Sequence, residues 1–176
     1  MRLKYSHEKA LYWVPSDHIG QVSVFQKLVH GLMKHGKKQK AFVLLSKAIL
    51  TAQQKLESQT DKQLPSTARS SVLGFEFVAQ AIENVRPSVE VRSKKIAGIS
   101  REIPCLVPTG RGQGLAIRWI IESARSRKKT GSRGFADNLA DELLDAYLQR
   151  GTPRQKRDNL HKTATTNRAY LRYRWW

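Results

Sequence analysis

The segment from Ala81 to Pro108, AIENVRPSVEVRSKKIAGISREIPCLVP, constrains the fold of this chain more than any other. A helical pattern ends at Arg86, because the residue before a proline is biased away from the α conformation. An alternating run follows from Val89 and turns at Ala97-Gly98, which predicts a two-stranded ribbon. The ribbon returns through Pro104, whose missing donor can face outward because both strands are edges. Two strands alone are marginally stable in water, so a ribbon rich in cations near its turn indicates a finger that reaches into a polyanion.

The charge of the chain indicates which polyanion this is. Lys and Arg number 32 against 14 Asp and Glu, so the formal net charge is +18. Such an excess is typical of proteins that bind nucleic acid. No apolar run approaches the roughly 18 residues of a spanning helix, and no broad Trp/Phe/Leu face accompanies the basic residues. We therefore expect a nucleic-acid partner and no membrane partner.

Cysteine usage and the amino terminus bear on the compartment. Cys105 is the only cysteine, which excludes a disulfide within the chain and a thiolate zinc site, and favours a reduced compartment. The first residues, MRLKYSHEKALYWVPSD, lack the apolar core of a secretory signal. They carry Glu8 and fewer Ser and Arg than organellar transit peptides have. We therefore expect the protein to act where it is made.

Hydrophobic periodicity predicts helices on both sides of the ribbon. We expect them at about Val22–Lys34, Lys38–Glu57, Pro65–Arg86, Leu115–Lys128, Phe135–Gln149 and Lys156–Tyr170. Gly110 to Gly114 and Thr130 to Gly134 are predicted to be flexible basic loops. The predicted fold is mainly α, about six helices in a bundle with one protruding two-stranded β-hairpin. It divides into an amino-terminal arm (1–19), a helical core (20–150) with the hairpin at about 88–107, and a basic, aromatic carboxyl-terminal helix and tail (151–176).

One segment resembles a nucleotide-binding loop. Gly31 to Lys38, GLMKHGKK, nearly fits the phosphate-binding G-x-x-x-x-G-K-[ST] pattern, but it lacks the final hydroxyl and follows no strand. We interpret Gly36 as a helix stop with two exposed lysines after it. The histidines form no metal-ligand pattern and are interpreted as solvated or RNA-facing: His7, His18, His30, His35 and His161.

An acidic stripe leaves one enzymatic alternative open. Asp137, Asp141 and Asp145 share one face of a predicted helix, with Glu142 beside them. Clustered carboxylates can hold a divalent metal for phosphodiester cleavage, so a metal-dependent nuclease is an alternative. Pairing with nearby arginines and the positive end of the helix dipole explain the same residues more simply.

Cations gather in two segments. Arg111 to Arg133 holds seven cations and one acid, and so does Gly151 to Trp176. The second segment interleaves aromatic residues among its arginines: Tyr170, Tyr173, Trp175 and Trp176. Arginine forms forked hydrogen bonds with phosphate, and aromatic rings stack on unpaired bases. Trp119 and Tyr147 fit core packing better than stacking.

Five segments resemble one known family. They are LMKHGKKQKAFVLLSKA from Leu32, AIENVRPSVEVRSKKIAGISREIPCLV from Ala81, LAIRWIIESARSR from Leu115, LADELLDA from Leu139 and NRAYLRYRW from Asn167. In this order they are similar to the bacterial and organellar branch of small-subunit ribosomal protein seven, and the resemblance covers about Val14 to Trp176. It implies a non-catalytic ribosomal protein without a cofactor, with six helices and an extended β-hairpin.

The resemblance also implies partners and binding residues. Such proteins bind the three-prime major domain of small-subunit rRNA, nucleate head assembly, and lie among ribosomal proteins of the head and platform. Their hairpin reaches toward the exit-site tRNA and the mRNA path. Arg92, Lys94 and Lys95 match the basic positions of that hairpin, and Lys37-Lys38 match the basic turn after the first helix. The RNA-binding residues we predict are Lys34, Lys37, Lys38, Arg92, Lys94, Lys95, Arg101, Arg111, Arg118, Arg125, Arg127, Lys128, Arg154, Lys156, Arg157, Arg168, Arg172 and Arg174.

Departures from the family pattern favour one compartment. The amino-terminal arm lacks a dense Arg run, residues 58–71 are expanded, and the Gly110 to Gly114 segment is unusually rich in glycine. These features favour a small ribosomal subunit in the mitochondrial matrix over one in a bacterial cytoplasm. Without a transit peptide, synthesis inside the organelle is the expectation. A general RNA chaperone outside the ribosome is the other alternative to a ribosomal protein.

Overall fold

The computed structural model describes residues 19–60, 74–128 and 134–174. Its elements are α2 (Ile19–Leu32), α3 (Lys38–Thr60), α4 (Gly74–Val85), β1 (Val89–Ile96), β2 (Ile99–Leu106), α5 (Thr109–Lys128), α6 (Phe135–Tyr147), α7 (Thr152–Thr166) and the 3-10 helix η3 (Asn167–Tyr173). For these residues the prediction of a mainly α fold with one two-stranded hairpin is confirmed. Residues 1–18 of the predicted arm and the predicted helix start at Pro65 lie outside the described residues.

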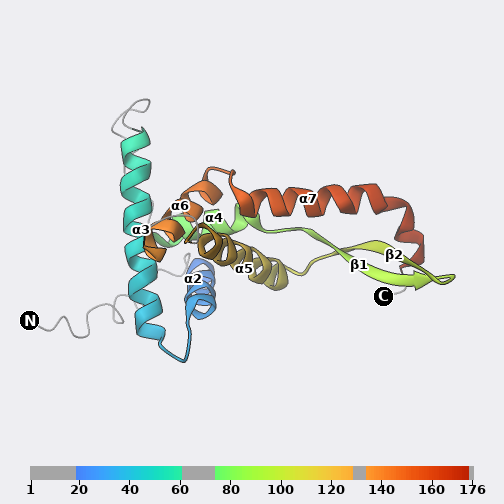
Figure 1. The fold of residues 1–176 in the computed structure, drawn as a ribbon, viewed down its shortest axis with the longest axis horizontal. Coiled ribbons are helices and arrows are strands. Elements are labelled where there is room, and N and C mark those ends of the chain that lie inside the picture. The colour runs from blue at the N-terminus through green and yellow to red at the C-terminus, as the bar shows by residue number, and fades with distance from the viewer. Residues whose placement is uncertain (1–18, 61–73, 129–133, 175–176) are drawn as a thin grey trace, which may run out of the picture.

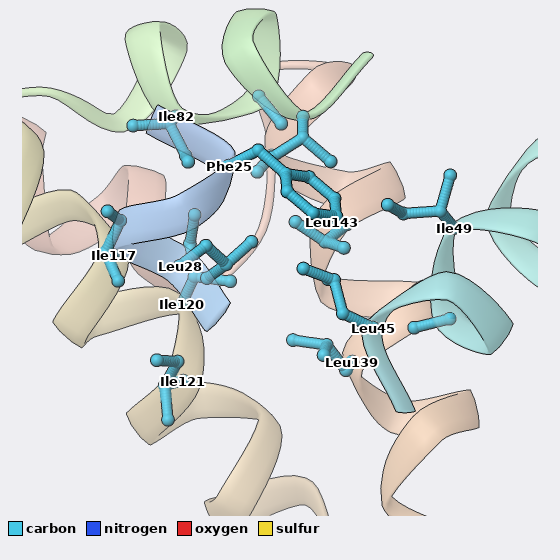
Figure 2. Close-up of a cluster of buried hydrophobic side chains, with 14 of the residues drawn as sticks. Phe25, Leu28, Leu45, Ile49, Ile82, Ile117, Ile120, Ile121, Leu139 and Leu143 are labelled. Carbon is cyan, nitrogen blue, oxygen red and sulfur yellow. The ribbon is translucent and has the colours of Figure 1, made fainter. Parts of the chain in front are cut away.

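Helices α2 to α6 enclose one apolar core (Figures 1 and 2). Each helix contributes fully or almost fully buried side chains to it, among them Leu28, Leu45, Ile82, Ile120 and Leu139. On each helix the inward residues recur at spacings of three and four, so that one stripe faces the core. Trp119 and Tyr147 pack against the same core, and the Tyr147 ring lies 5.0 Å from that of Phe77, as predicted for both.

The hairpin turns where the sequence predicts it. Ile96 lies opposite Ile99, which leaves a two-residue connection. Ala97 and Gly98 have φ values of 49° and 81°. Positive φ at both positions is typical of a type I′ turn, whose twist matches that of the two strands.

Pro104 occupies a position where its missing N–H removes no hydrogen bond between the two strands. The Val107 N–H donates to the Ser88 carbonyl at 3.0 Å at the base of the hairpin. Hydrogen-bonded and non-hydrogen-bonded pairs alternate from there, which puts Pro104 and its partner Val91 in a non-hydrogen-bonded pair. The missing donor therefore faces outward, as predicted.

The hairpin protrudes from the bundle, but it does not stand alone. Helix α7 leaves the bundle and lies beside the strands, and η3 continues toward the turn (Figure 1). Ile103 and Cys105 of the returning strand are buried, and so is Val107 directly after it. His161 of α7 accepts a hydrogen bond from the Ser88 N–H, with 3.2 Å between the nitrogens. This contact corrects the interpretation of His161 as solvated or RNA-facing, because its Nε2 binds the base of the hairpin.

The segment from Gly110 to Gly114 is helical, which corrects the predicted loop. Helix α5 begins at Thr109, and the Gly112 N–H donates to the Pro108 carbonyl at 2.9 Å. A Cβ on Gly112 would lie 3.0 Å from the Pro87 carbonyl oxygen. Each glycine lowers helix propensity by about 1 kcal/mol, which is why the sequence predicts a loop here. The close approach of α5 to Pro87 favours glycine at one of these positions all the same.

The carboxyl-terminal helix begins earlier than predicted. Helix α7 starts at Thr152 and gives way to η3 at Asn167, whereas the sequence predicts a helix from Lys156 to Tyr170. Pro153 fits the first turn, because an N–H at this position would have no partner within the helix. Only the residues from Leu148 to Gly151 therefore separate α6 from α7.

Candidate nucleic-acid interface

The turn between α2 and α3 presents three of the predicted RNA-binding lysines. Lys34, Lys37 and Lys38 are exposed. Backbone hydrogen bonds order the turn, since the Lys37 N–H donates to the Lys34 carbonyl at 3.1 Å and the Lys38 N–H to the Gly36 carbonyl at 2.8 Å. None of the three ammonium groups has a polar partner in the part of the chain that the structure describes. They are therefore free to bind phosphate.

A groove of about 860 Å³ lies between α2 and α5. Ile117 and Ile121 give it apolar surface, and the helices approach closely at Gly31, where a Cβ would lie 3.0 Å from Ile121 Cδ1. Glu122 also lines the groove, and it pairs with Lys156 of α7 at 2.9 Å. Three cations line the groove: Lys27, Arg118 and Arg125.

Sequence reasoning missed one cation of this groove. Arg118 and Arg125 are among the predicted residues, but Lys27 is not. A signal was present, because Lys27 lies seven residues before Lys34 and therefore on the same face of the predicted helix Val22–Lys34. Its Nζ donates to Gln113 Oε1 of α5 at 2.9 Å, which ties the two walls of the groove together.

Arg92 and Arg111 share one carboxylate at the base of the hairpin. Glu90 is buried, and its two oxygens lie 3.1 Å from Arg92 and 2.8 Å from Arg111. Burial raises the pKa of Glu90, but the hydrogen bonds from Arg111 and Arg92 outweigh it and hold the pKa below its ordinary value. The arginine side chains are 52% and 57% exposed, so each keeps guanidinium surface for phosphate while it fixes β1 to the start of α5.

Arg127 neutralises the acidic face of α6. Its guanidinium lies 2.9 Å from Glu142, 3.1 Å from Asp145 and 3.8 Å from Asp141, and Lys55 of α3 also pairs with Asp141. Burial raises the pKa of Glu142, and Arg127 opposes the rise. Asp141 and Asp145 of the predicted stripe are thus paired with cations of neighbouring helices, as the simpler interpretation holds. Among the described residues, no cluster of His, Cys, Asp or Glu has a geometry that fits a metal ion.

The sequence predicts that Arg127 and Lys128, at the end of α5, both bind RNA. Arg127 has an intramolecular role that competes with phosphate contact, and its RNA binding stays a prediction. Lys128 is the last residue of the helix, and its side chain lies outside the described part of the structure.

Arg154 and Arg157 hold the carboxyl end of α4. Both donate to the Asn84 carbonyl at 2.9 Å, where cations offset the negative end of the helix dipole. The Asn84 amide donates in turn to the carbonyls of Ala146 and Tyr147, at 3.2 and 2.9 Å. These hydrogen bonds join the ends of α4 and α6 to the start of α7. The two arginines thus have a structural role that the sequence did not reveal, and phosphate contact by them stays a prediction.

The predicted cations near the hairpin turn fall into two groups. Lys94 Nζ donates to the Tyr173 carbonyl at 3.4 Å, and Arg101 Nη1 donates to the Tyr170 hydroxyl at 2.8 Å. Lys95 is exposed and has no polar partner in the described residues. On and after η3, three more predicted cations are exposed: Arg168, Arg172 and Arg174.

Comparison with known proteins agrees with this architecture. The family model of ribosomal protein S7p/S5e matches residues 3–168. The small ribosomal subunit protein uS7m of Prototheca wickerhamii is 48% identical over 102 residues, which are 58% of this chain and 46% of that protein. Bacterial proteins named uS7 match over a longer range. The Pelagibacter ubique protein is 35% identical over 92% of this chain and 93% of its own length, and the Roseobacter denitrificans protein is 38% identical over 86% of both chains.

These matches confirm the resemblance that the five sequence segments carry. The family model spans most of the chain, and the bacterial relatives align with it nearly from end to end. No helix within the described residues combines the length and the apolar character that crossing a membrane requires. The chain belongs to the ribosomal protein S7p/S5e family and is a structural, non-enzymatic protein of the small ribosomal subunit.

Proposed function

We propose that this protein binds the three-prime major domain of small-subunit rRNA and nucleates assembly of the head of the subunit. The observation that carries the proposal is the set of exposed cations without an internal acceptor among the described residues. They are Lys34, Lys37 and Lys38 at the α2–α3 turn, Arg118 and Arg125 on the wall of the α2–α5 groove, and Lys95 and Arg168 beside the distal part of the hairpin. A chain of net charge +18 that leaves cations free in three separate places fits a folded RNA better than a small anion.

Recognition would read the shape and backbone of the RNA. Ammonium and guanidinium groups that neutralise phosphates release counterions, and this release drives binding and makes it depend on salt. The groove adds apolar surface from Ile117 and Ile121 between its cations, which suits the sugar edge of a strand. Arg101 and Arg172 lie over the rings of Tyr170 and Tyr173, so less ring surface would be open for base stacking.

The proposal extends to the neighbours and the compartment. The hairpin would lie near the exit-site tRNA and the mRNA path, and the body of the protein beside ribosomal proteins of the head and platform. The mitochondrial matrix is the proposed compartment. The 48% identity with an organellar relative supports it, although bacterial relatives match more of the chain.

The first experiment measures binding to a transcript of the three-prime major domain over a series of salt concentrations. The double variant Lys37→Ala/Lys38→Ala should weaken binding and lower the salt slope by about 0.7–0.9 for each phosphate that the variant no longer neutralises. Arg118→Ala/Arg125→Ala should do the same. Lys162→Ala removes one exposed cation of α7 outside the predicted set and should leave the slope unchanged.

Two different results would contradict the proposed function, one in the binding assay and one in sedimentation. Equal affinity for an unrelated RNA of the same length at every salt concentration would favour the general RNA chaperone. Sedimentation of tagged protein from a lysate tests whether the protein is a ribosomal component or an RNA chaperone outside the ribosome. We expect co-migration with the small ribosomal subunit after a high-salt wash, and migration as free protein would contradict stable membership.

A further inference from the structure

The carboxyl-terminal part of the chain contacts the hairpin at successive points from base to turn. At the base, His161 binds Ser88. Farther along, Asn167 Nδ2 donates to Glu102 Oε2 at 3.1 Å. Near the turn, η3 supplies the partners of two strand cations. The contacts follow the order in which α7 and η3 lie alongside the strands in Figure 1.

Four planar groups form a ladder at the far end of these contacts. The Arg101 guanidinium donates to the Tyr170 hydroxyl at 2.8 Å and also lies 5.1 Å from the centroid of its ring. The Tyr170 and Tyr173 rings are 6.4 Å apart, and Arg172 lies 4.9 Å from the Tyr173 centroid. Arg101 belongs to β2 and the other three residues to η3, so the ladder joins the two elements.

The distal half of the hairpin, residues 93–102, needs such support because its own strand pairs are polar. Ser93 faces Glu102, Lys94 faces Arg101 and Lys95 faces Ser100. The closing pair, Ile96 and Ile99, lies at the turn, where Ile99 is 56% exposed. Cross-strand pairs and burial stabilise a ribbon, and this half has little of either.

We propose that Arg101 and Tyr170 are positioning residues, which hold the distal half of the hairpin against η3 and thereby fix its direction. Arg101 acts on RNA through the geometry of the hairpin, whereas Lys95 and Arg168 remain free to bind phosphate. The part of the proposal that concerns RNA rests on the proposed function. The part that concerns the hairpin concerns the free protein alone.

The first test needs no RNA. In the register of the hairpin, the amides of Lys94, Ile96, Ile99 and Arg101 lie in hydrogen-bonded pairs. Tyr170→Phe removes the hydroxyl acceptor without a change of charge and keeps the ring. Hydrogen exchange of the distal amides should become about threefold to tenfold faster, as the loss of one hydrogen bond allows, while core amides stay unchanged. Exchange at wild-type rates in both Tyr170→Phe and Tyr170→Ala would overturn the proposal.

Two variants separate positioning from charge. Lys95→Ala removes an exposed cation of the same hairpin, and it should leave the distal exchange rates unchanged. Arg101→Lys keeps a donor, and it should restore part of the protection that Arg101→Ala loses. Equal exchange in Arg101→Ala and wild type would show that the ladder does not hold the strands.

The second test measures binding to the three-prime major domain transcript against salt. If Arg101 positions the hairpin, Arg101→Ala and Tyr170→Phe both lower the affinity and leave the salt slope unchanged. Lys95→Ala should lower the slope by about 0.7–0.9. A lower slope in Arg101→Ala, together with wild-type affinity in Tyr170→Phe, would identify Arg101 as a direct phosphate contact and refute the positioning role. If no variant bound the transcript differently from an unrelated RNA, the proposed function would fail while the exchange result stood.

Discussion

The glycines at the start of α5 offer a quantitative test of how this helix packs against the junction of α4 and β1. A Cβ on Gly112 would lie 3.0 Å from the Pro87 carbonyl oxygen and 3.0 Å from Arg86 Cγ. Nothing lies within 4 Å of a Cβ built on Gly110 or Gly114. In a helix, Ala is favoured over Gly by about 1 kcal/mol. Extra volume in a filled site costs about 1–3 kcal/mol.

At Gly112 the gain in helix propensity and the cost of the added volume oppose each other, whereas at Gly114 only the gain applies. Gly114→Ala should raise the free energy of unfolding by about 1 kcal/mol, which raises Tm by about 2–4 °C for a chain of this size. Gly112→Ala has the same helical advantage and also meets the Pro87 carbonyl. Its net change should lie between zero and a loss of about 2 kcal/mol, so that the two variants differ by about 1–3 kcal/mol.

Urea unfolding followed by circular dichroism measures both variants, with Gly110→Ala as a second control in open space. Equal m-values would show that the variants differ in stability and not in the surface exposed on unfolding. A Gly112→Ala variant as stable as Gly114→Ala would refute the close packing of α5 on Pro87. The flexible loop that the sequence predicts for this segment would then be the better description.

Three further changes test other contacts of the structure. Folding raises the pKa of Glu142, mainly through burial. The contribution of Glu142 to stability is therefore greatest below pH 4.5, its ordinary pKa, and declines as pH rises through the folded pKa. In urea unfolding, Glu142→Gln should gain stability relative to wild type between pH 4.5 and 7. Folding lowers the pKa of His161, first through burial and then through Arg157, so the contribution of His161 to stability is complete above pH 6.5 and is lost as pH falls through the folded pKa. The protection of the Ser88 amide against hydrogen exchange, relative to its intrinsic rate at each pH, should fall over the same range, and it should not change with pH in His161→Phe. Asn84→Ala should cost about 2–3 kcal/mol in urea unfolding, because both hydrogen bonds that the amide donates are removed and the carbonyls of Ala146 and Tyr147 lose their side-chain donor.

Each of these changes has a contrary result. A constant difference between Glu142→Gln and wild type from pH 4.5 to 7 would show that the carboxylate is not destabilised by burial. A protection factor of the Ser88 amide that does not change with pH would remove the link to His161. The free energy of unfolding of Asn84→Ala could instead lie within about 0.5 kcal/mol of wild type, the size expected for a surface change such as Glu83→Ala. That result would show that the hydrogen bonds at the end of α4 contribute little to stability.

The helices and the hairpin could be predicted because local pattern and burial agree in them. Leu45 and Ile49 recur at helical spacing on α3, and both are buried. Ala97-Gly98 lies between two alternating runs, and the turn forms there. The glycines of α5 could not be predicted as helical, since the contact that favours Gly112 involves Pro87, from a different element. Helix propensity depends on residues near in sequence, whereas this packing depends on a residue of a different element.

The partners of the cations are harder to predict for the same reason. Arg154 binds a carbonyl 70 positions away, and Lys94 binds one 79 positions away. A guanidinium group offers the same donors to a helix end, a carboxylate or a phosphate, and its sequence neighbours do not distinguish these acceptors. Charge alone therefore does not distinguish cations that stabilise helix ends or buried acids from cations that bind RNA.

This division of the cations has a measurable consequence for RNA binding. The chain has 32 Lys and Arg, but Arg127 and Arg154 are among those that already have internal acceptors. If such groups keep their internal acceptors in the complex, they neutralise no phosphate and release no counterions on binding. The salt slope should therefore report only the exposed cations at the α2–α3 turn, the groove and the hairpin end. A slope that approached the full net charge of +18 would mean that the internal pairs exchange their acceptors for RNA, and that the folded core is rearranged in the complex.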